Sequence, residues 1–436
     1  MERDVIARLV GWLDARLGTA PFVRSALRKA FPDHWSFALG EVNAYCFLIL
    51  VVSGTYLALF FDPSDAYRST VRLSFEVEAG LFVRQLHHWT ALLFVAAILA
   101  HAARVFFTGA FRRPRELTWM LGVLLCGAAI FEGFAGYSLP GDLLSGIGLR
   151  IADSVALSIP VVGTWVSGLA LGGAFPSAQM LPRLFVAHVY LLPAAIAGLM
   201  LAHVAIIWRQ KHTQFRGPGR TEANVVGAPL FPNYALRSFA LGTGVLAIVC
   251  ALGAIVQINP VWTYGPYVPW QALSPAQPDW YLSWLEGALR LSPAWEPHIF
   301  GHPIPPVFWP GVVLPLVGGL IFFLWPFLER AATGDDREHN LLDRPSDAPL
   351  RTAIGVAALT AFAVLTAAGA DDVLSAATYV SVFTIANIFR VAVVVLPLLF
   401  GAIAYLLANR GPRDARAERT RIIRNAAGGY DEEPVA

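Results

Sequence analysis

The chain has 436 residues, of which 56% are hydrophobic and only 14% are charged. A soluble chain of this length would carry about a quarter charged residues, so the deficit excludes an ordinary soluble protein and indicates several membrane passages. The formal net charge of +2 gives no indication of a nucleic-acid partner, because the basic residues gather in particular loops.

The N-terminal residues MERDVIARLVGWLDARL mix charged and apolar side chains. They lack the apolar core of roughly 7–15 residues that a cleavable signal peptide needs. We therefore predict that residues 1–30 form an amphipathic helix that lies on the membrane lipid surface.

A bilayer core takes about 20 apolar residues per helix. Eight stretches qualify: residues 37–61, 83–107, 117–139, 184–208, 238–258, 307–328, 352–369 and 383–408. The sequence therefore predicts an all-α membrane protein with eight transmembrane helices. We expect an N-terminal four-helix domain at 31–220, a C-terminal four-helix domain at 221–410 and a charged tail at 411–436.

The loops between these stretches differ in charge. Basic residues gather around 24–29, 112–115, 209–220 and 330–351 and in the tail, whereas the loops 62–82, 140–182 and 259–306 carry few. Basic loops stay in the cytoplasm, which predicts that both termini are cytoplasmic. The long outer loops 140–182 and 259–306 are rich in glycine, proline and aromatic residues, so we expect them to be functional or packed as short helices.

The three cysteines, Cys46, Cys126 and Cys250, all lie in apolar runs. The sequence contains no CxxC pair, no CxxCH motif and no disulfide framework. We therefore expect no c-type haem, iron–sulfur cluster or zinc ion to be held by cysteine.

Four histidines lie inside predicted spans, His87 and His101 in the second and His188 and His203 in the fourth. Ionisable groups at membrane depth are costly and mark functional sites. The two spacings, 14 and 15 residues, are close to four helical turns. Each pair should therefore lie on one face of its helix, at two levels about 21–22 Å apart.

The second and fourth spans run in the same direction, so His87 matches His188 near the outer face and His101 matches His203 near the cytoplasmic face. Two levels of facing imidazoles suit two non-covalent b-type haems, each ligated from both helices. One isolated membrane histidine could equally be a hydrogen-bonded core group or part of a proton relay. Four at matched spacing favour iron ligation.

Two arginines accompany the ligand candidates. Arg84 stands one turn before His87, and Arg104 stands three residues after His101. Each is placed to pair with haem propionates near a membrane face, although snorkelling to the interface would also explain it. His88 lies 100° round the helix from His87. It is a candidate for packing, for a propionate neighbour or for a group on the quinol side.

Two pairs of glycines repeat the histidine spacing. Gly40 and Gly54 lie 14 residues apart in the first span, and Gly122 and Gly136 lie 14 apart in the third. Two flat macrocycles at levels about 21 Å apart need small residues at those depths, because backbone must approach the ring edges. The glycines therefore support the two-haem arrangement.

These motifs together resemble cytochrome b, the core subunit of the cytochrome bc family of quinol:cytochrome c reductases. The resemblance rests on RQLHH…HAAR, HVYLLPAAIAGLMLAHV, GYSLP at 136–140 and PDWY at 278–281. FFTGAFRRPRE, QKHTQFRGPGRTE and HNLLDRP are similar to the actinobacterial branch. The resemblance implies a subunit of a dimeric respiratory complex in a bacterial plasma membrane. The implied partners are a Rieske iron–sulfur protein, a dihaem cytochrome c and an aa3-type oxidase.

The resemblance also implies a Q-cycle coupled to proton translocation. Quinol, with menaquinol favoured, is oxidised at the outer face and gives one electron to the Rieske protein. The other electron passes from a low-potential haem on His87 and His188 to a high-potential haem on His101 and His203. It then reduces quinone near the cytoplasmic face.

By the same resemblance, the quinol oxidation site should include Tyr137, Asp279, Trp280 and Tyr281, with a carboxylate as general base for a phenolic proton. The family normally has glutamate where this chain has Asp279, which is one methylene shorter. Glu286, two turns further on, is a second acceptor candidate. PDWY could also be a proline-led helix start with an acid in the first turn.

The quinone reduction site is less specified. Many relatives have a lysine–aspartate pair where this chain has Arg237 and Ser238, and a family histidine is replaced by Trp208. The candidates by location alone are Glu41, Lys211 and His212.

Two other functions fit parts of the sequence. A transporter or channel with a histidine proton relay would account for eight spans with buried ionisable groups. A dihaem membrane anchor of a dehydrogenase would account for the histidines but would not need PDWY.

Overall fold

The computed structural model of the chain describes residues 2–273, 277–299, 301–410, 419–424 and 430–435. Eight helices in these ranges are long and apolar enough to cross a membrane. They are Trp35–Ala58, Gly80–Phe107, Glu116–Ser138, Met180–Arg209, Leu230–Ile255, Trp309–Thr333, Pro349–Ala368 and Val382–Arg410. All eight predicted spans are confirmed, with shifted ends.

Several spans combine helical types. The spans consist of η1 (Trp35–Ala38) with α3 (Leu39–Ala58), α5 (Gly80–Phe107), α6 (Glu116–Ser138), α9 (Met180–Val186) with η3 (Ala187–Leu191) and α10 (Leu192–Arg209), η4 (Leu230–Tyr234) with α11 (Ala235–Ile255), η6 (Trp309–Val313) with α13 (Leu314–Thr333), α14 (Pro349–Ala368) and α16 (Val382–Arg410). Helices are expected here, since a helix satisfies its backbone hydrogen bonds within one segment where no water is available.

Shorter elements connect the spans. The helices are α1 (Glu2–Leu17), α2 (Thr19–Arg28), η2 (Pro63–Asp65), α4 (Ala66–Phe75), α7 (Leu143–Leu157), α8 (Gly163–Leu171), η5 (Val261–Thr263), α12 (Trp280–Leu291), η7 (Pro345–Asp347) and α15 (Asp371–Thr378). The strands form three antiparallel pairs, β1 (Ala30–Phe31) with β2 (Ala228–Pro229), β3 (His298–Ile299) with β4 (His302–Pro303), and β5 (Arg419–Arg424) with β6 (Tyr430–Val435).

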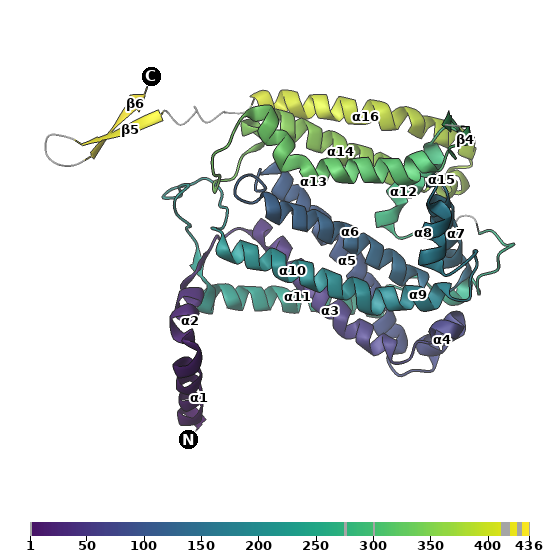
Figure 1. Cartoon of the computed structure of the whole chain (residues 1–436), viewed down its shortest axis with the longest axis horizontal. Helices are drawn as coiled ribbons and strands as arrows, with labels where there is room; N and C mark the ends of the chain where they lie inside the picture. The colour runs from purple at the N-terminus through teal and green to yellow at the C-terminus, as the bar shows by residue number, and fades with distance from the viewer. Residues whose placement is uncertain (1, 274–276, 300, 411–418, 425–429, 436) are drawn as a thin grey trace.

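The first four spans form the centre of the molecule. Helix α5 packs against α3 and α6, and α6 packs against α10. The later spans are distributed around this set, because α11 packs on α3 and α5, α13 on α6, and α14 on α5 and α16 (Figure 1). Large apolar side chains remain exposed on the outer helices, such as Phe239 at 72% and Leu398 at 70%. Such a surface is stable against lipid chains rather than water.

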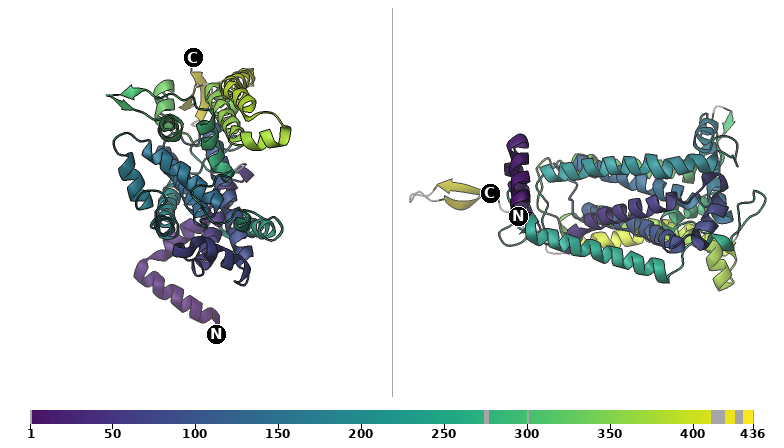
Figure 2. Two further views of the ribbon diagram at one scale, coloured as in Figure 1. Left: turned by 90° about the vertical axis from the view of Figure 1, so that its right-hand side faces the viewer. Right: turned by 90° about the horizontal axis from the view of Figure 1, so that it is seen from below.

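The two ends of the bundle differ. Helices α4, α7, α8, α12 and α15 gather at one end, and α1 and the C-terminal strands lie at the other (Figures 1 and 2). The long loops 140–182 and 259–306 contain short helices, as predicted. Helix α1 runs across the direction of the spans (Figure 2), which is the orientation of a helix that lies on a membrane surface.

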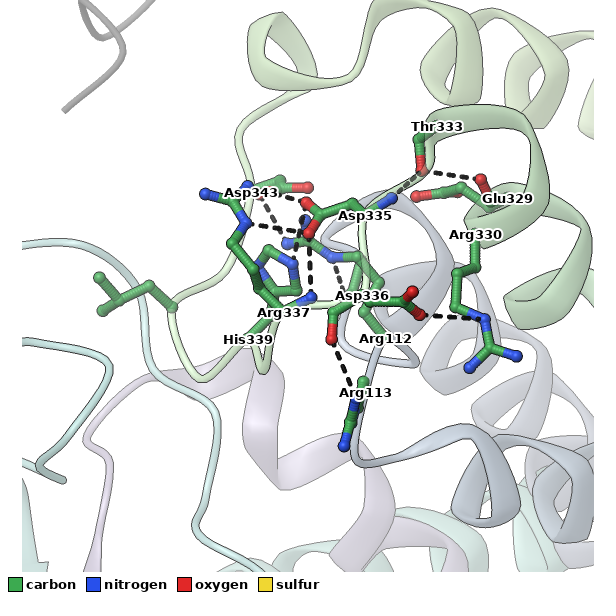
Figure 3. Close-up of polar contacts among 12 residues, drawn as sticks. Arg112, Arg113, Glu329, Arg330, Thr333, Asp335, Asp336, Arg337, His339 and Asp343 are labelled. Carbon is green, nitrogen blue, oxygen red and sulfur yellow. Dashed lines mark hydrogen bonds and ion pairs between the residues drawn. The ribbon is translucent and has the colours of Figure 1, made fainter. Parts of the chain in front are cut away.

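An ionic cluster joins two loops at the end where the chain begins. Arg112 pairs with Asp343 at 2.7 Å, Arg337 pairs with Asp335 at 2.8 Å, and Arg113 donates to the backbone oxygen of Asp336 at 3.1 Å (Figure 3). The contacts of Arg112 and Arg113 connect the α5–α6 loop to the loop between α13 and α14. The basic loops therefore have local acidic partners and are held against the ends of the spans.

Candidate functional site

The outer histidine pair faces across the interior of the bundle. His87 on α5 and His188 on η3 have ring centroids 6.2 Å apart, with ring planes inclined by 79°. If one metal ion lay between the rings, each metal–nitrogen bond would add about 2 Å and each ring about 1 Å from nitrogen to centroid. The distance from centroid to centroid would then be roughly 6 Å. The two rings therefore stand at a separation at which both would hold one metal ion between them.

Hydrogen bonds determine which ring nitrogen is available. The Nδ1 atom of His87 lies 2.9 Å from the Ser53 hydroxyl oxygen. The Nδ1 atom of His188 lies 3.1 Å from both the carboxylate Oε1 and the backbone oxygen of Glu132. Since Nδ1 is engaged in both rings, Nε2 is left for a metal.

The fourth span contains a π-helical turn at the histidine. Residues Ala187–Leu191 form η3, and Pro193 follows it. Proline has no N–H to bond the carbonyl four residues earlier, so the chain makes a wider turn here. The wider turn absorbs one residue. It therefore accounts for the spacing of 15 residues between His188 and His203, one more than in the second span.

The inner pair lies four turns away along the same helices. His101 on α5 and His203 on α10 are close enough to interact electrostatically. Within the described residues, both Nδ1 atoms are buried without a hydrogen-bond partner. The backbone of Thr118 lies close to the His203 ring. The structure therefore contains the two levels that the spacing predicts.

Each of the four glycines faces one of the four histidines. From the position that an added Cβ would occupy to the ring Cε1 atom, the distances are 3.1 Å for Gly54 and His87, 3.5 Å for Gly40 and His101, 2.5 Å for Gly136 and His188, and 3.7 Å for Gly122 and His203. The backbones of α3 and α6 thus approach the imidazoles at both levels. An added Cβ at Gly136 or Gly54 would press on the facing ring, whereas at Gly40 and Gly122 it would make ordinary van der Waals contact.

Gly136→Ala tests this packing most strongly. Its Cβ would lie 2.5 Å from the His188 ring, so we expect the ring to shift, the outer haem to be lost and the fold to be destabilised by about 1–3 kcal/mol. The control is Gly127→Ala on the same helix, where an added Cβ meets no heavy atom within 4 Å. Haem absorbance and thermal unfolding of the two variants measure the difference. Equal behaviour would show that Gly136 has no role in holding the ring.

Arg84 and Arg104 have buried guanidinium nitrogens that lack a hydrogen-bond partner among the described residues, although the charge of Asp142 acts on Arg84. In each, Nε and Nη2 are buried and have no hydrogen-bond partner within the described part of the chain. Arg84 lies 5.7 Å from the Trp262 ring, and Arg104 lies 4.2 Å from the Phe37 ring. A buried guanidinium without a counterion is costly. The propionates of a haem at each level would supply the missing anions, so the residues present fit two haems.

One cavity joins the outer histidine pair to the predicted quinol residues. Its wall includes His87 and His188, and it also includes Tyr137, Asp279 and Tyr281. Residues from α5, α6, η3 and α12 therefore meet around one space, although they lie far apart in the sequence.

The Asp279 carboxylate points toward this cavity. Asp279 precedes α12, but its side chain makes no capping hydrogen bond to that helix. Its oxygens lie 2.9 and 3.1 Å from Nε2 of His88 and 3.2 Å from the Tyr281 hydroxyl. Burial and the nearby Asp279 raise the pKa of Tyr281 well above its usual range, so this hydroxyl keeps its proton and donates to Asp279. A helix start at PDWY accounts for the backbone, since α12 begins at Trp280. It does not account for the Asp279 carboxylate, which makes no cap.

Glu286 has a different environment. Its Oε1 lies 3.1 Å from Nε of Arg290, and Arg290 also pairs with Asp371 and Asp372. Burial raises the pKa of Glu286, and Arg290 opposes this shift. Neither Glu286 nor Trp280 is among the residues that line the cavity. The structure thus separates the two acceptor candidates.

The candidates at the opposite end are only partly brought together. Glu41 accepts a hydrogen bond from the Tyr234 hydroxyl at 2.5 Å. Phe31 stacks on Tyr234 at 4.2 Å and contacts the His212 ring at 4.5 Å. Burial lowers the pKa of His212 to about 4, so the ring is neutral at physiological pH. Lys211 instead donates to the backbone of Ala223 at 3.0 Å.

The residues that stand where relatives have the lysine–aspartate pair and the histidine contact neighbouring groups. Arg237 pairs with Asp33 at 2.7 Å, and Ser238 is hydrogen bonded to Tyr45 at 3.0 Å. Lys29 lies 4.7 Å from the Trp208 ring.

The sequence did not reveal two polar partners of the outer pair or the partner of His88. Ser53 and Glu132 contact the ligand candidates, and His88 contacts Asp279. Glu132 could have been found, since it is an acid in the middle of the third span, where ionisable groups indicate function. The partner of His88 could not, because 191 residues separate it from Asp279.

Comparisons with known proteins point to one family. The family model described as cytochrome b(N-terminal)/b6/petB matches residues 92–266. Proteins named cytochrome bc1 complex cytochrome b subunit are similar over most of the chain. The one from Mycobacterium leprae is 47% identical over 422 residues, covering 92% of this chain and 76% of that protein. Those from Corynebacterium efficiens and Streptomyces coelicolor are 45% and 44% identical, covering 91% and 90% of this chain and 76% and 75% of those proteins.

A solved structure has the same fold. A chain of a hyperthermophilic respiratory Complex III aligns with a TM-score of 0.70 and 22% identity, covering 92% of this chain and 99% of that chain. The structural likeness shows the fold, and the curated relatives show the family. The chain belongs to the cytochrome b subunits of the respiratory cytochrome bc1 complex, a family of membrane proteins whose name implies haem cofactors.

Proposed function

We propose that this chain is the dihaem subunit of a respiratory quinol:cytochrome c reductase in a bacterial plasma membrane. Quinol, of the menaquinol type, binds in the cavity at the outer end and is oxidised there. Electrons cross on two b-type haems, one held by His87 and His188 and the other by His101 and His203. They reach a quinone at the cytoplasmic end, and proton release and uptake on opposite sides complete a Q-cycle.

The shared cavity is the observation that carries this proposal. Its wall contains both members of the outer histidine pair together with Asp279 and Tyr281. A quinol bound there would stand next to a proton acceptor and next to the outer haem. A histidine relay in a transporter would not need this combination, and neither would a haem anchor without quinol oxidation.

The polar residues at the two ends of the bundle have separate roles in this proposal. Asp279 accepts a phenolic proton, and the hydrogen bonds from His88 and Tyr281 hold its carboxylate toward the cavity. Arg84 neutralises a propionate at the outer level, and Arg104 does the same at the inner level. The haems, when bound, supply the one-electron acceptors. Glu41, Tyr234 and His212 are the polar groups placed to hold the quinone at the opposite end.

Further subunits are needed for turnover. The three cysteines of the chain form no motif for an iron–sulfur cluster or a c-type haem. The relatives are named as subunits of a bc1 complex. We therefore propose a Rieske protein and a dihaem cytochrome c as partners in a dimeric complex, with an aa3-type oxidase as the next electron acceptor.

Addition of menaquinol to the purified complex tests this function. We expect the b haems to accept electrons, which appears as the absorbance band of reduced b haem. Cytochrome c should be reduced in proportion to the quinol consumed. Absence of haem from the purified chain would favour the transporter alternative. Haem that is present but not reduced by quinol would favour an anchor of another enzyme.

A further inference from the structure

The two histidine levels differ in what contacts the ligand rings. At the outer level, Nδ1 of His87 meets the Ser53 hydroxyl at 2.9 Å, and Nδ1 of His188 meets both the carboxylate and the backbone oxygen of Glu132 at 3.1 Å. At the inner level, within the described residues, the Nδ1 atoms of His101 and His203 have neither a hydroxyl nor a carboxylate partner. The two levels therefore differ in the polar side chains that contact the rings.

Glu132 occupies a costly position. It lies on α6 inside a membrane span, with its side chain 19% exposed and its Oε2 atom buried without a partner in the described ranges. An acid at membrane depth costs stability, and such residues therefore mark functional sites. Its carboxylate contacts His188, a ligand candidate on another helix, and its charge acts on Tyr281 in the wall of the same cavity, so both neighbours belong to the outer level.

We infer that Glu132 and Ser53 are positioning residues that lower the reduction potential of the outer haem relative to the inner one. This inference rests on the proposed function. A ring that donates its Nδ1–H to an oxygen acceptor becomes a more basic ligand through Nε2, and a carboxylate is the stronger acceptor of the two. A more basic axial ligand stabilises the oxidised iron, which lowers the potential.

The direction of electron flow follows from this difference. An electron that enters at the outer level moves inward only if the inner level has the higher potential. Because the inner rings lack these acceptors, their iron is the more readily reduced. The contacts at Glu132 and Ser53 therefore make the transfer across the membrane favourable.

Redox titration of the purified complex at one fixed pH tests the inference. We expect Glu132→Gln to raise the midpoint potential of the outer haem, Glu132→Ala to raise it further, and Ser53→Ala to raise it through the other ligand. The inner potential should stay unchanged in all three. The matched control is Glu116→Gln, which removes a carboxylate from the opposite end of α6, where it pairs with Arg330 at 3.8 Å. It should leave the outer potential unchanged.

An unchanged outer potential in these variants, or an equal shift of both haems, would overturn the inference. Glu132→Ala could lose the outer haem altogether. In that case the outer midpoint potentials of Glu132→Gln and Ser53→Ala decide, since they must rise while the inner potential stays unchanged. Failure of the proposed function is recognised separately, because the unaltered complex would then contain no pair of titrating haems.

Discussion

His101→Ala and His203→Ala will each remove the same haem and leave one haem per chain instead of two. The two residues lie at one level of the bundle, on α5 and α10, and in the proposed function each would supply one ligand to the same haem. His87→Ala and His188→Ala will remove the other haem for the same reason, since their rings face each other at 6.2 Å. Reduced-minus-oxidised spectra of the four variants check the pairing.

A variant of the adjacent His88 tests whether His87 or His88 is the haem ligand. His88 contacts Asp279 rather than the opposite histidine, so His88→Ala should retain both haems. Different spectral losses in His101→Ala and His203→Ala would contradict the pairing. Loss of the outer haem in His88→Ala, with retention in His87→Ala, would reassign the ligand.

Asp279→Asn will slow quinol oxidation by about 10²–10⁴-fold while both haems remain, because a positioned general base contributes about that factor. The asparagine keeps the size of the side chain and its contact with His88 but cannot take up a proton. Steady-state reduction of cytochrome c by menaquinol measures the loss, and the haem spectrum shows that the site is otherwise intact.

Two further acids make this experiment specific. Glu76→Gln is the control, because Glu76 pairs with Arg72 on an exposed surface, where both side chains are 66% exposed. Glu286→Gln distinguishes the two acceptor candidates, since Glu286 is bound to Arg290 and lies off the cavity wall. A loss in Glu286→Gln equal to that in Asp279→Asn would show that the proton does not go to Asp279 alone.

Much of the architecture could be predicted because membrane spans depend on local composition. Runs of about 20 apolar residues identified all eight helices. The helical repeat then placed His87 and His101 on one face of the second span, and Gly122 and Gly136 on one face of the third. These features need only the geometry of one helix.

The remaining features depend on contacts between distant segments. The His88–Asp279 contact joins α5 to the start of α12, and no periodicity predicts that meeting. The arrangement of α11 and α13 around the first four spans depends on packing that composition does not determine. The quinone candidates Glu41 and His212 share an aromatic neighbour in Phe31, which comes from a strand that the hydropathy pattern does not show.

The most direct test of the account is a redox titration of the purified complex together with its haem content per cytochrome b chain. The account predicts two b-type haems per chain, which titrate as two separate one-electron steps of equal amplitude. A content of one haem or none, or a single step, would contradict the two-level arrangement of histidines on which the proposed function depends.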